Sequence, residues 1–179
     1  MAGDGQHDNP INAQHPYGRC QAEAGKPMNA KLVIVGQGYV GLPVAMRAVE
    51  VGFEVVGLDC DKNRVQELQR GRSYIGDVSS SALAQALSSG RYLPTSDYAE
   101  AQGFGIAVIT VPTPLRETLP DLSFIEDAAA MLAPSLAAGA TVILESTTYP
   151  GTTEELLVPI LERHSGCLLY TSPSPRDRS

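Results

Sequence analysis

The chain of 179 residues has no tryptophan, few aromatic residues (6%) and few basic ones. Its 13 lysines and arginines are outnumbered by 20 aspartates and glutamates, which gives a formal net charge of -7. Nucleic acids and anionic membranes are bound by clustered Lys and Arg, so this balance argues against both as partners. The most apolar stretch, residues 128–144, is broken by Pro134 and Gly139, and no run approaches the roughly 18 apolar residues of a membrane span. The expected partners are small molecules or other proteins.

Cysteine and histidine are also scarce, and their spacing excludes more than their number does. The three cysteines form no CxxC, and the three histidines form no HxxxH. Because structural zinc sites depend on such spacings, no metal site is expected.

The two ends of the chain differ from its middle. Residues 1–27 are polar and rich in Gly, Gln and Asn, without the apolar core of a signal peptide, so they are expected to be a disordered extension or a misassigned start before Met28. Residues 167–179 fit no helix or strand pattern and look like a translated sequencing adapter, which predicts a non-native tail. The expected folded domain is residues 28–166.

Within that domain, β-branched apolar runs alternate with helical patterns. Strands are expected at residues 31–35, 54–59, 92–95, 105–111 and 141–145, and helices at 40–51, 62–71, 80–89, 121–138 and 152–164. Asp121 is a candidate N-cap of the fourth helix, which Pro134 would either kink or end early. Thr152 and Glu155 have the spacing of a capping box at the fifth.

This alternation predicts an α/β fold with a doubly wound parallel sheet, covered by helices on both faces. Ligands of such sheets bind beyond the carboxyl ends of the strands. The informative residues should therefore follow the strands directly.

The first such place carries a G-x-G-x-x-G motif, Gly36, Gly38 and Gly41, between a predicted strand and a predicted helix. Glycines there permit a tight turn, close approach to a pyrophosphate and close helix packing. Asp59 ends the second strand, where a carboxylate accepts the hydroxyls of an adenosine ribose and repels a 2′-phosphate. NAD is therefore preferred over NADP, although Arg64 is close enough to accommodate that phosphate. The alternative is a tight turn with Asp59 capping the next helix.

Two other strand ends carry polar groups. Val111, Pro112 and Thr113 follow the fourth strand, where a rigid turn presents a hydroxyl to a cofactor or a water. Glu145 follows the fifth strand and is a candidate general base if partial burial tunes its pKa. The alternatives are a solvated turn at Thr113 and structural or capping roles for residues 145–148. Cys60, beside Asp59, is interpreted as a packed or incidental thiol rather than a nucleophile.

Six motifs stand in order along the chain: Gly36-Gln-Gly-Tyr-Val-Gly-Leu-Pro, Leu58-Asp-Cys-Asp-Lys-Asn-Arg, Ser73-Tyr-Ile, Val111-Pro-Thr-Pro-Leu, Pro120-Asp-Leu-Ser and Glu145-Ser-Thr-Thr-Tyr-Pro-Gly-Thr-Thr. Together they resemble the N-terminal domain of the UDP-glucose/GDP-mannose dehydrogenase family of nucleotide sugar 6-dehydrogenases. The resemblance covers about residues 28–166. The last two motifs look closer to the UDP-N-acetylhexosamine branch, which includes UDP-N-acetylglucosamine 6-dehydrogenases, than to the UDP-glucose branch.

The resemblance implies a Rossmann-type NAD-binding domain and oxidation of the C6 alcohol of a UDP-sugar to a carboxylate, with two NAD used in turn. The residues implied to bind the cofactor are Gly36, Gln37, Gly38, Tyr39, Val40, Gly41, Asp59, Arg64, Val111, Pro112 and Thr113. Catalytic assistance is implied for Thr113 and Glu145. The implied substrate-side residues are Glu145, Ser146, Thr147, Thr148 and Tyr149. A cytoplasmic location, and a homo-oligomer for the full-length form, are also expected.

One departure from the family is large. Family members carry the nucleophilic cysteine and most substrate contacts in a second domain, which cannot be assigned in this sequence. We therefore expect the chain to bind NAD without turning over. The alternatives are a stand-alone NAD-binding or regulatory module and another NAD-dependent hydroxy-acid dehydrogenase, although the Thr113 and Glu145 motifs favour nucleotide sugars.

Overall fold

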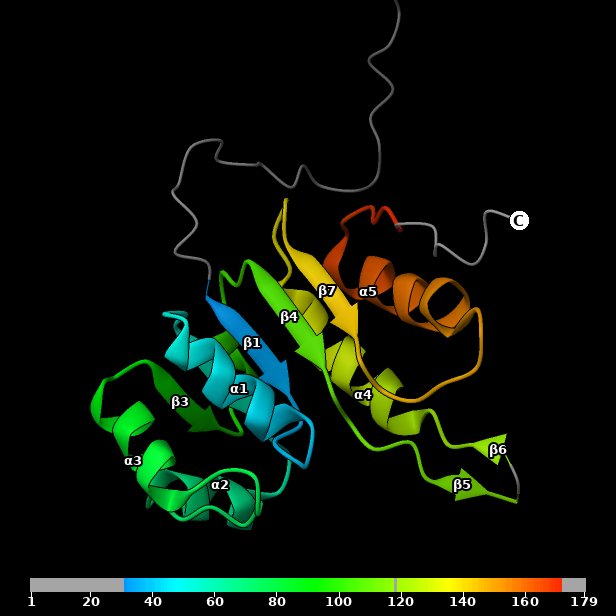
Figure 1. Cartoon of the computed structure of the whole chain (residues 1–179). Helices are drawn as coiled ribbons and strands as arrows, with labels where there is room; N and C mark the ends of the chain where they lie inside the picture. The colour runs from blue at the N-terminus through cyan, green and yellow to red at the C-terminus, as the bar shows by residue number, and fades with distance from the viewer. Residues whose placement is uncertain (1–30, 118, 172–179) are drawn as a thin grey trace, which may run out of the picture.

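Five parallel strands form one sheet in the order β3-β2-β1-β4-β7 (Figure 1). The computed structural model describes residues 31–117 and 119–171, so the expected leader at 1–27 and the end of the expected tail lie outside the described residues. The strands are β1 (Leu32–Val35), β2 (Val55–Leu58), β3 (Tyr92–Thr95), β4 (Ile106–Ile109) and β7 (Thr141–Leu144). The predicted parallel sheet is confirmed.

Helices cover both faces of this sheet, as predicted for a doubly wound fold (Figure 1). They are α1 (Gly41–Glu50), α2 (Lys62–Gln69), α3 (Ser80–Ser88), α4 (Ser123–Leu132) and α5 (Val158–Ser165). Side chains of α1, α2 and α3 pack with Leu32 and Ile34 of β1 in one apolar cluster. Side chains of α4 and α5 pack with Val33 and Val35 in the other.

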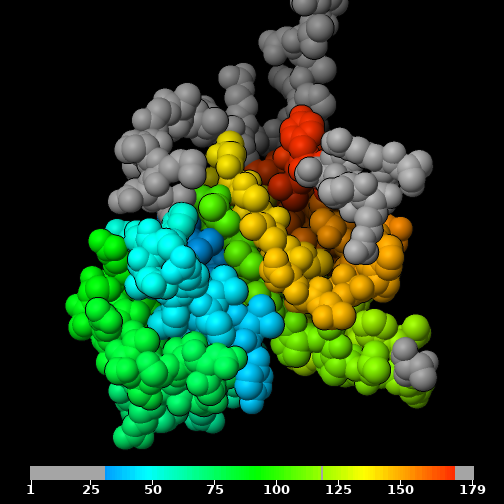
Figure 2. Space-filling view, in the orientation of Figure 1, coloured from blue at the N-terminus to red at the C-terminus, as the bar shows by residue number. Residues whose placement is uncertain are grey.

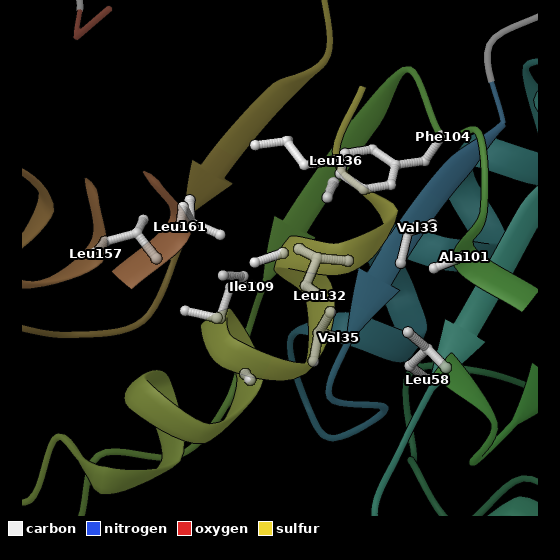
Figure 3. Close-up of a cluster of buried hydrophobic side chains, with 14 of the residues drawn as sticks. Val33, Val35, Leu58, Ala101, Phe104, Ile109, Leu132, Leu136, Leu157 and Leu161 are labelled. Carbon is white, nitrogen blue, oxygen red and sulfur yellow. The ribbon is translucent and has the colours of Figure 1, made fainter. Parts of the chain in front are cut away.

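The cluster that packs against α4 and α5 shows why the strands are almost continuously apolar (Figure 3). Val33, Val35 and Ile109 point from the sheet toward Leu132 of α4 and Leu161 of α5. All four residues of β1 are buried, because successive side chains enter opposite layers.

The edge strand β7 has two different faces. Val142 and Leu144 pack against the α4 and α5 cluster, whereas Ile143 is 40% exposed. Figure 2 shows β7 (yellow) at the surface between α1 (cyan) and α5 (orange). Alternation along the strand places Glu145 on this exposed face, two residues after Ile143.

The register brings the ends of four strands into one row. Val35 of β1 pairs with Leu58 of β2 and with Ile109 of β4, and Ile109 pairs with Leu144 of β7. The next residue of each strand therefore lies along the same edge: Gly36, Asp59, Thr110 and Glu145.

The fourth helix starts later than predicted, and it ends early, which is one of the two effects expected of Pro134. Its N-cap is Leu122. Asp121, one position before the N-cap, accepts the Ser123 N–H at its Oδ1 (3.1 Å). The helix ends at Leu132 rather than near Ala138, and Ala133–Ser135 forms a 3-10 turn that contains Pro134. The missing N–H and fixed φ of proline explain the early end.

The predicted capping box at the fifth helix is wrong. The buried Thr152 donates its hydroxyl to Tyr149 O (2.8 Å), and no side chain caps the turn that follows. A π-helical turn, Thr153–Leu157, precedes α5. The hydroxyl faces the preceding loop because a buried donor needs an acceptor there.

Two short segments lie outside the main sheet and its helices. A short antiparallel hairpin, β5 (Leu115–Arg116) and β6 (Leu119–Pro120), follows the Pro-rich turn and was not predicted, since each strand has only two residues. Residues 167–171 form no helix or strand, yet Cys167 is buried against the α4 and α5 cluster. The domain boundary at residue 166 stays a prediction.

Candidate functional site

The loop between β1 and α1 combines two glycines that packing requires with one that it does not. Gly36 has φ +93°, and an added Cβ would lie 2.8 Å from Thr110 O. A Cβ on Gly41 would collide with Gly36 O. A Cβ on Gly38, in contrast, would meet nothing within 4 Å. The space at Gly38 therefore faces the side on which a ligand would approach.

The start of α1 supports the same direction of approach. Its N-cap is Val40, no side chain caps it, and its first turn has no acidic residue. Tyr39 and Val40 are exposed, at 80% and 50%. An uncapped helix N-terminus offers N–H donors and partial positive charge to an anion such as a pyrophosphate.

Asp59 ties the end of β2 to this loop. Its Oδ2 accepts the Gln37 N–H (2.9 Å), and its Oδ1 accepts the Asp61 N–H (2.9 Å). Because each carboxylate oxygen has two lone pairs, these bonds leave acceptor capacity for ribose hydroxyls. The N-cap of α2 is Asp61, so the alternative in which Asp59 caps that helix is wrong.

Arg64 lies directly beside this carboxylate. Its Nη1 is 3.6 Å from Asp59 Oδ2, and its Nε is 3.7 Å from Asp61 Oδ2. The guanidinium carbon also lies over the Tyr74 ring, 5.9 Å from the centroid. The structure therefore brings Arg64 together with Asp59 and the glycine loop, as the motifs predicted.

The Gln37 side chain is turned away from the ligand side. It is fully buried, donates from Nε2 to Ile34 O (2.9 Å) and accepts the Tyr92 hydroxyl at Oε1 (2.7 Å). Its N–H is already donated to Asp59. Gln37 thus shapes the loop from below, and a side-chain contact to the cofactor is not available to it.

Two tyrosines that sequence reasoning gave no role hold Gln37 in place. Tyr74 donates its hydroxyl to Gln37 O (2.6 Å), and Tyr92 donates to the side chain. Burial, followed by the negative charge of Asp59, raises the pKa of Tyr74 to about 12. Burial likewise raises the pKa of Tyr92 well above its usual value. Both phenols are protonated at neutral pH like any tyrosine, and the raised pKa keeps them donors in more alkaline solution as well.

The sequence of β2 contains a residue that could have predicted the buried position of the Gln37 side chain. Gly57 interrupts an otherwise apolar strand, and an added Cβ there would lie 2.7 Å from Gln37 Oε1. A glycine inside a strand commonly marks such a close approach.

The loops after β4 and β7 are joined by hydrogen bonds from a side-chain hydroxyl of each loop to a backbone carbonyl of the other. Thr113 donates to Thr147 O (2.7 Å), and Ser146 donates to Val111 O (2.8 Å). Thr110 joins them to the glycine loop, because its Oγ1 lies 2.8 Å from Gly36 O. We call the two hydrogen bonds from Thr113 to Thr147 O and from Ser146 to Val111 O the loop clasp. The predicted nicotinamide-side and substrate-side residues are thus brought together.

Glu145 lies at the same edge with an exposed side chain. The interpretation of Glu145 as a base assumed partial burial, and that assumption is wrong because its side chain projects from the open face of the edge strand. Thr148 and Tyr149 continue the loop, and Tyr149 is 45% exposed. The catalytic and binding roles of these residues stay predictions.

Removing one hydroxyl should loosen the loop clasp without unfolding the chain. Ser146→Ala deletes the bond to Val111 O, and we expect a stability loss of about 1 kcal/mol. Amide hydrogen exchange at Glu145, whose N–H is donated to Ile109 O (2.9 Å) where the two loops begin, should accelerate. Ser88→Ala is the control, since its hydroxyl donates to Gln85 O on α3. Equal exchange at Glu145 in both variants would contradict the clasp.

The described residues hold neither a group of three or more His, Cys, Asp or Glu placed to bind a metal nor a helix long and apolar enough to cross a membrane. What the edge does offer is an open glycine turn, an uncapped helix N-terminus and a carboxylate at the end of β2. Fold and site together define a dinucleotide-binding domain of the dehydrogenase class.

The family follows from the sequence match. The family model described as "UDP-glucose/GDP-mannose dehydrogenase family, NAD binding domain" matches residues 30–171, most of the chain. The chain therefore belongs to the UDP-glucose/GDP-mannose dehydrogenase family, and its cofactor is NAD.

Curated relatives agree with this assignment. UDP-N-acetyl-D-glucosamine 6-dehydrogenase of Salmonella typhi is 42% identical over 140 residues, which are 76% of this chain and 31% of the relative. The Pseudomonas aeruginosa protein of the same name is 40% identical over 139 residues, 76% of this chain and 32% of the relative. The chain thus spans about a third of the length of these relatives.

Solved structures give the same picture. A UDP-D-ManNAc dehydrogenase from Pyrococcus horikoshii has a TM-score of 0.73 at 33% identity, with 78% of this chain and 33% of that chain covered. A ternary complex of GDP-mannose dehydrogenase from Pseudomonas aeruginosa has a TM-score of 0.71 at 28% identity, with 76% and 33% covered. A metagenomic lactate dehydrogenase reaches a TM-score of 0.50 at 24% identity, which shows the shared fold alone.

Proposed function

We propose that this chain is the NAD-binding part of a dehydrogenase that oxidises the C6 alcohol of a UDP-sugar to a carboxylate, using two NAD. The substrate we propose is a UDP-N-acetylhexosamine, in keeping with the names of the relatives that match at about 40% identity. The observation that carries the proposal is the open space at Gly38 between the uncapped N-terminus of α1 and the buried Asp59 carboxylate, which accepts the Gln37 N–H (2.9 Å).

The residues around that space fit the cofactor. The turn at Gly36 and Gly38 and the N-terminus of α1 would hold the pyrophosphate, and Asp59 would accept hydroxyls of the adenosine ribose. When bound, NAD accepts a hydride from the carbon being oxidised. Tyr39 and Val40 are exposed next to the turn, which suits a role in lining the cofactor.

At the β4 and β7 end of the same edge, the loop clasp supports the proposed catalytic roles of Thr113 and Glu145. Thr113 donates its proton to Thr147 O, so toward a water or substrate its hydroxyl acts as an acceptor. Glu145 is exposed and free to take a proton from an attacking water. Ser146 to Tyr149 would line the substrate side. A homo-oligomeric full-length form and a cytoplasmic location belong to the same proposal and rest on membership of the family alone.

The chain should bind NAD without steady turnover. The free thiol among the described residues is Cys60, which is exposed next to Asp59, on the adenosine side and away from the loop clasp. Calorimetric titration should detect NAD, whereas NAD with UDP-N-acetylglucosamine should give no steady absorbance at 340 nm. A full-length relative serves as the positive control. Steady NADH formation by this chain would contradict the expectation, and absent NAD binding would overturn the proposed function itself.

A further inference from the structure

Arg64 is held on three sides. The buried Asp59 lies on one side (3.6 Å), the exposed Asp61 on a second (3.7 Å) and the ring of Tyr74 on the third (5.9 Å to the centroid). Arg64 itself is about half exposed, at 49%. Two carboxylates therefore share one guanidinium, and the local charge beside the ribose position is negative.

We propose that Asp61 is a specificity-determining residue that enforces the preference for NAD over NADP. It does so by keeping Arg64 in the ion pair with Asp59, so that no free guanidinium is presented to a 2′-phosphate. This inference rests on the proposed binding of NAD at Asp59. It adds to the charge of Asp59 a second device that acts through Arg64, which makes Asp61 a positioning residue.

The chemistry of Arg64 gives such a device a purpose. A guanidinium beside the ribose recognises a phosphate well, because its planar donors match phosphate oxygens. An arginine at this place would therefore favour NADP if it were unpaired. Asp61 removes that option at little cost, because the same side chain also caps α2 by accepting the Asn63 N–H and Arg64 N–H at its Oδ1.

Asp61→Asn separates the two roles of this side chain. Asparagine caps a helix about as well as aspartate, so the fold should be retained. The negative charge that holds Arg64 is lost. Glu67→Gln is the matched control, because it removes a carboxylate of the same helix that pairs with Arg70 and Arg72 instead. Melting temperatures of both variants report whether the fold is intact.

The ligands are 5′-AMP and adenosine 2′,5′-bisphosphate, which differ only by the 2′-phosphate. Calorimetric titration of each gives the ratio of the two Kd values. In Asp61→Asn we expect this ratio to shift toward the bisphosphate by about three- to fivefold, since an exposed ion pair is a modest restraint. Glu67→Gln should leave the ratio unchanged. An unchanged ratio in Asp61→Asn, or an equal shift in both variants, would overturn the proposal.

A double variant tests whether the effect passes through Arg64. The reference is Arg64→Gln alone: in that background Asp61→Asn should leave the ratio unchanged. A shift as large as in the wild-type background would mean that loss of negative charge alone explains the effect, against the proposal. A wild-type chain that binds neither 5′-AMP nor NAD would refute the proposed function, and with it this role for Asp61. A wild-type chain that binds both, with no shift in Asp61→Asn, would refute the role of Asp61 alone.

Discussion

Replacing Gly41 with alanine should remove most of the stability of the domain. The new Cβ would collide with Gly36 O and lie 2.6 Å from Thr110 Oγ1. A backbone carbonyl cannot rotate away as a side chain can, so α1 must separate from β1 and β4. We expect a loss of about 3 kcal/mol or more, larger than the roughly 1 kcal/mol that alanine gains over glycine in a helix. Urea unfolding at 25 °C measures it.

Gly38→Ala should have the opposite profile. Its Cβ meets nothing within 4 Å, so the free energy of unfolding should stay within about 0.5 kcal/mol of wild type. The methyl group would occupy the space proposed for the pyrophosphate, and NAD affinity should fall at least about tenfold, since close backbone approach is what this glycine permits.

The matched control for this pair is Gly76→Ala. Gly76 also has nothing within 4 Å of an added Cβ, and it lies outside the glycine loop. It should change neither stability nor affinity. If Gly38→Ala bound NAD like wild type, the pyrophosphate would not lie at Gly38. If it unfolded as readily as Gly41→Ala, the open space would be refuted.

The positions of the glycine loop, Asp59 and Thr113 could be predicted because each of them follows the end of a strand. β1, β2 and β4 are buried on both faces and therefore read as short apolar runs in the sequence. Once the strands are parallel and in register, whatever follows them must share an edge. Gly36, Asp59 and Thr113 could thus be grouped from the sequence alone.

The underside of the glycine loop could not be predicted in the same way. Gln37 is bonded to Tyr74 and Tyr92, which are 37 and 55 residues away. A motif treats every loop residue alike, so it assigned Gln37 to the ligand side. Only packing distinguishes a side chain beneath a loop from one above it.

The capping rule failed at Thr152 because burial and a different local hydrogen bond competed with it. Thr152 is 1% exposed, and its hydroxyl turns to Tyr149 O rather than to the helix that follows. The exposure of Glu145 was missed for a related reason, since the sequence does not state which strand is the edge of the sheet. Burial at a strand end depends on that neighbour.

Replacing Asp59 should damage both folding and cofactor binding. Its side chain is only 4% exposed, and its two oxygens accept the Gln37 and Asp61 N–H groups. Asp59→Ala leaves both donors without this acceptor, and we expect a loss of about 2 to 4 kcal/mol in the free energy of unfolding. NAD affinity should fall below detection, since the ribose acceptor is lost with the loop geometry.

Asp59→Asn separates these two effects, because an amide keeps the shape but offers one acceptor oxygen instead of two. It should cost less stability than alanine, yet still reduce NAD affinity at least about tenfold, since charge-assisted bonds are the stronger ones. Asp97→Ala is the control: Asp97 follows β3 and accepts the Ala99 N–H, so its loss should lower stability by about 1 kcal/mol and leave affinity unchanged. Wild-type affinity in Asp59→Asn would show that the ribose does not bind at this carboxylate, and the cofactor would then have to lie elsewhere along the edge.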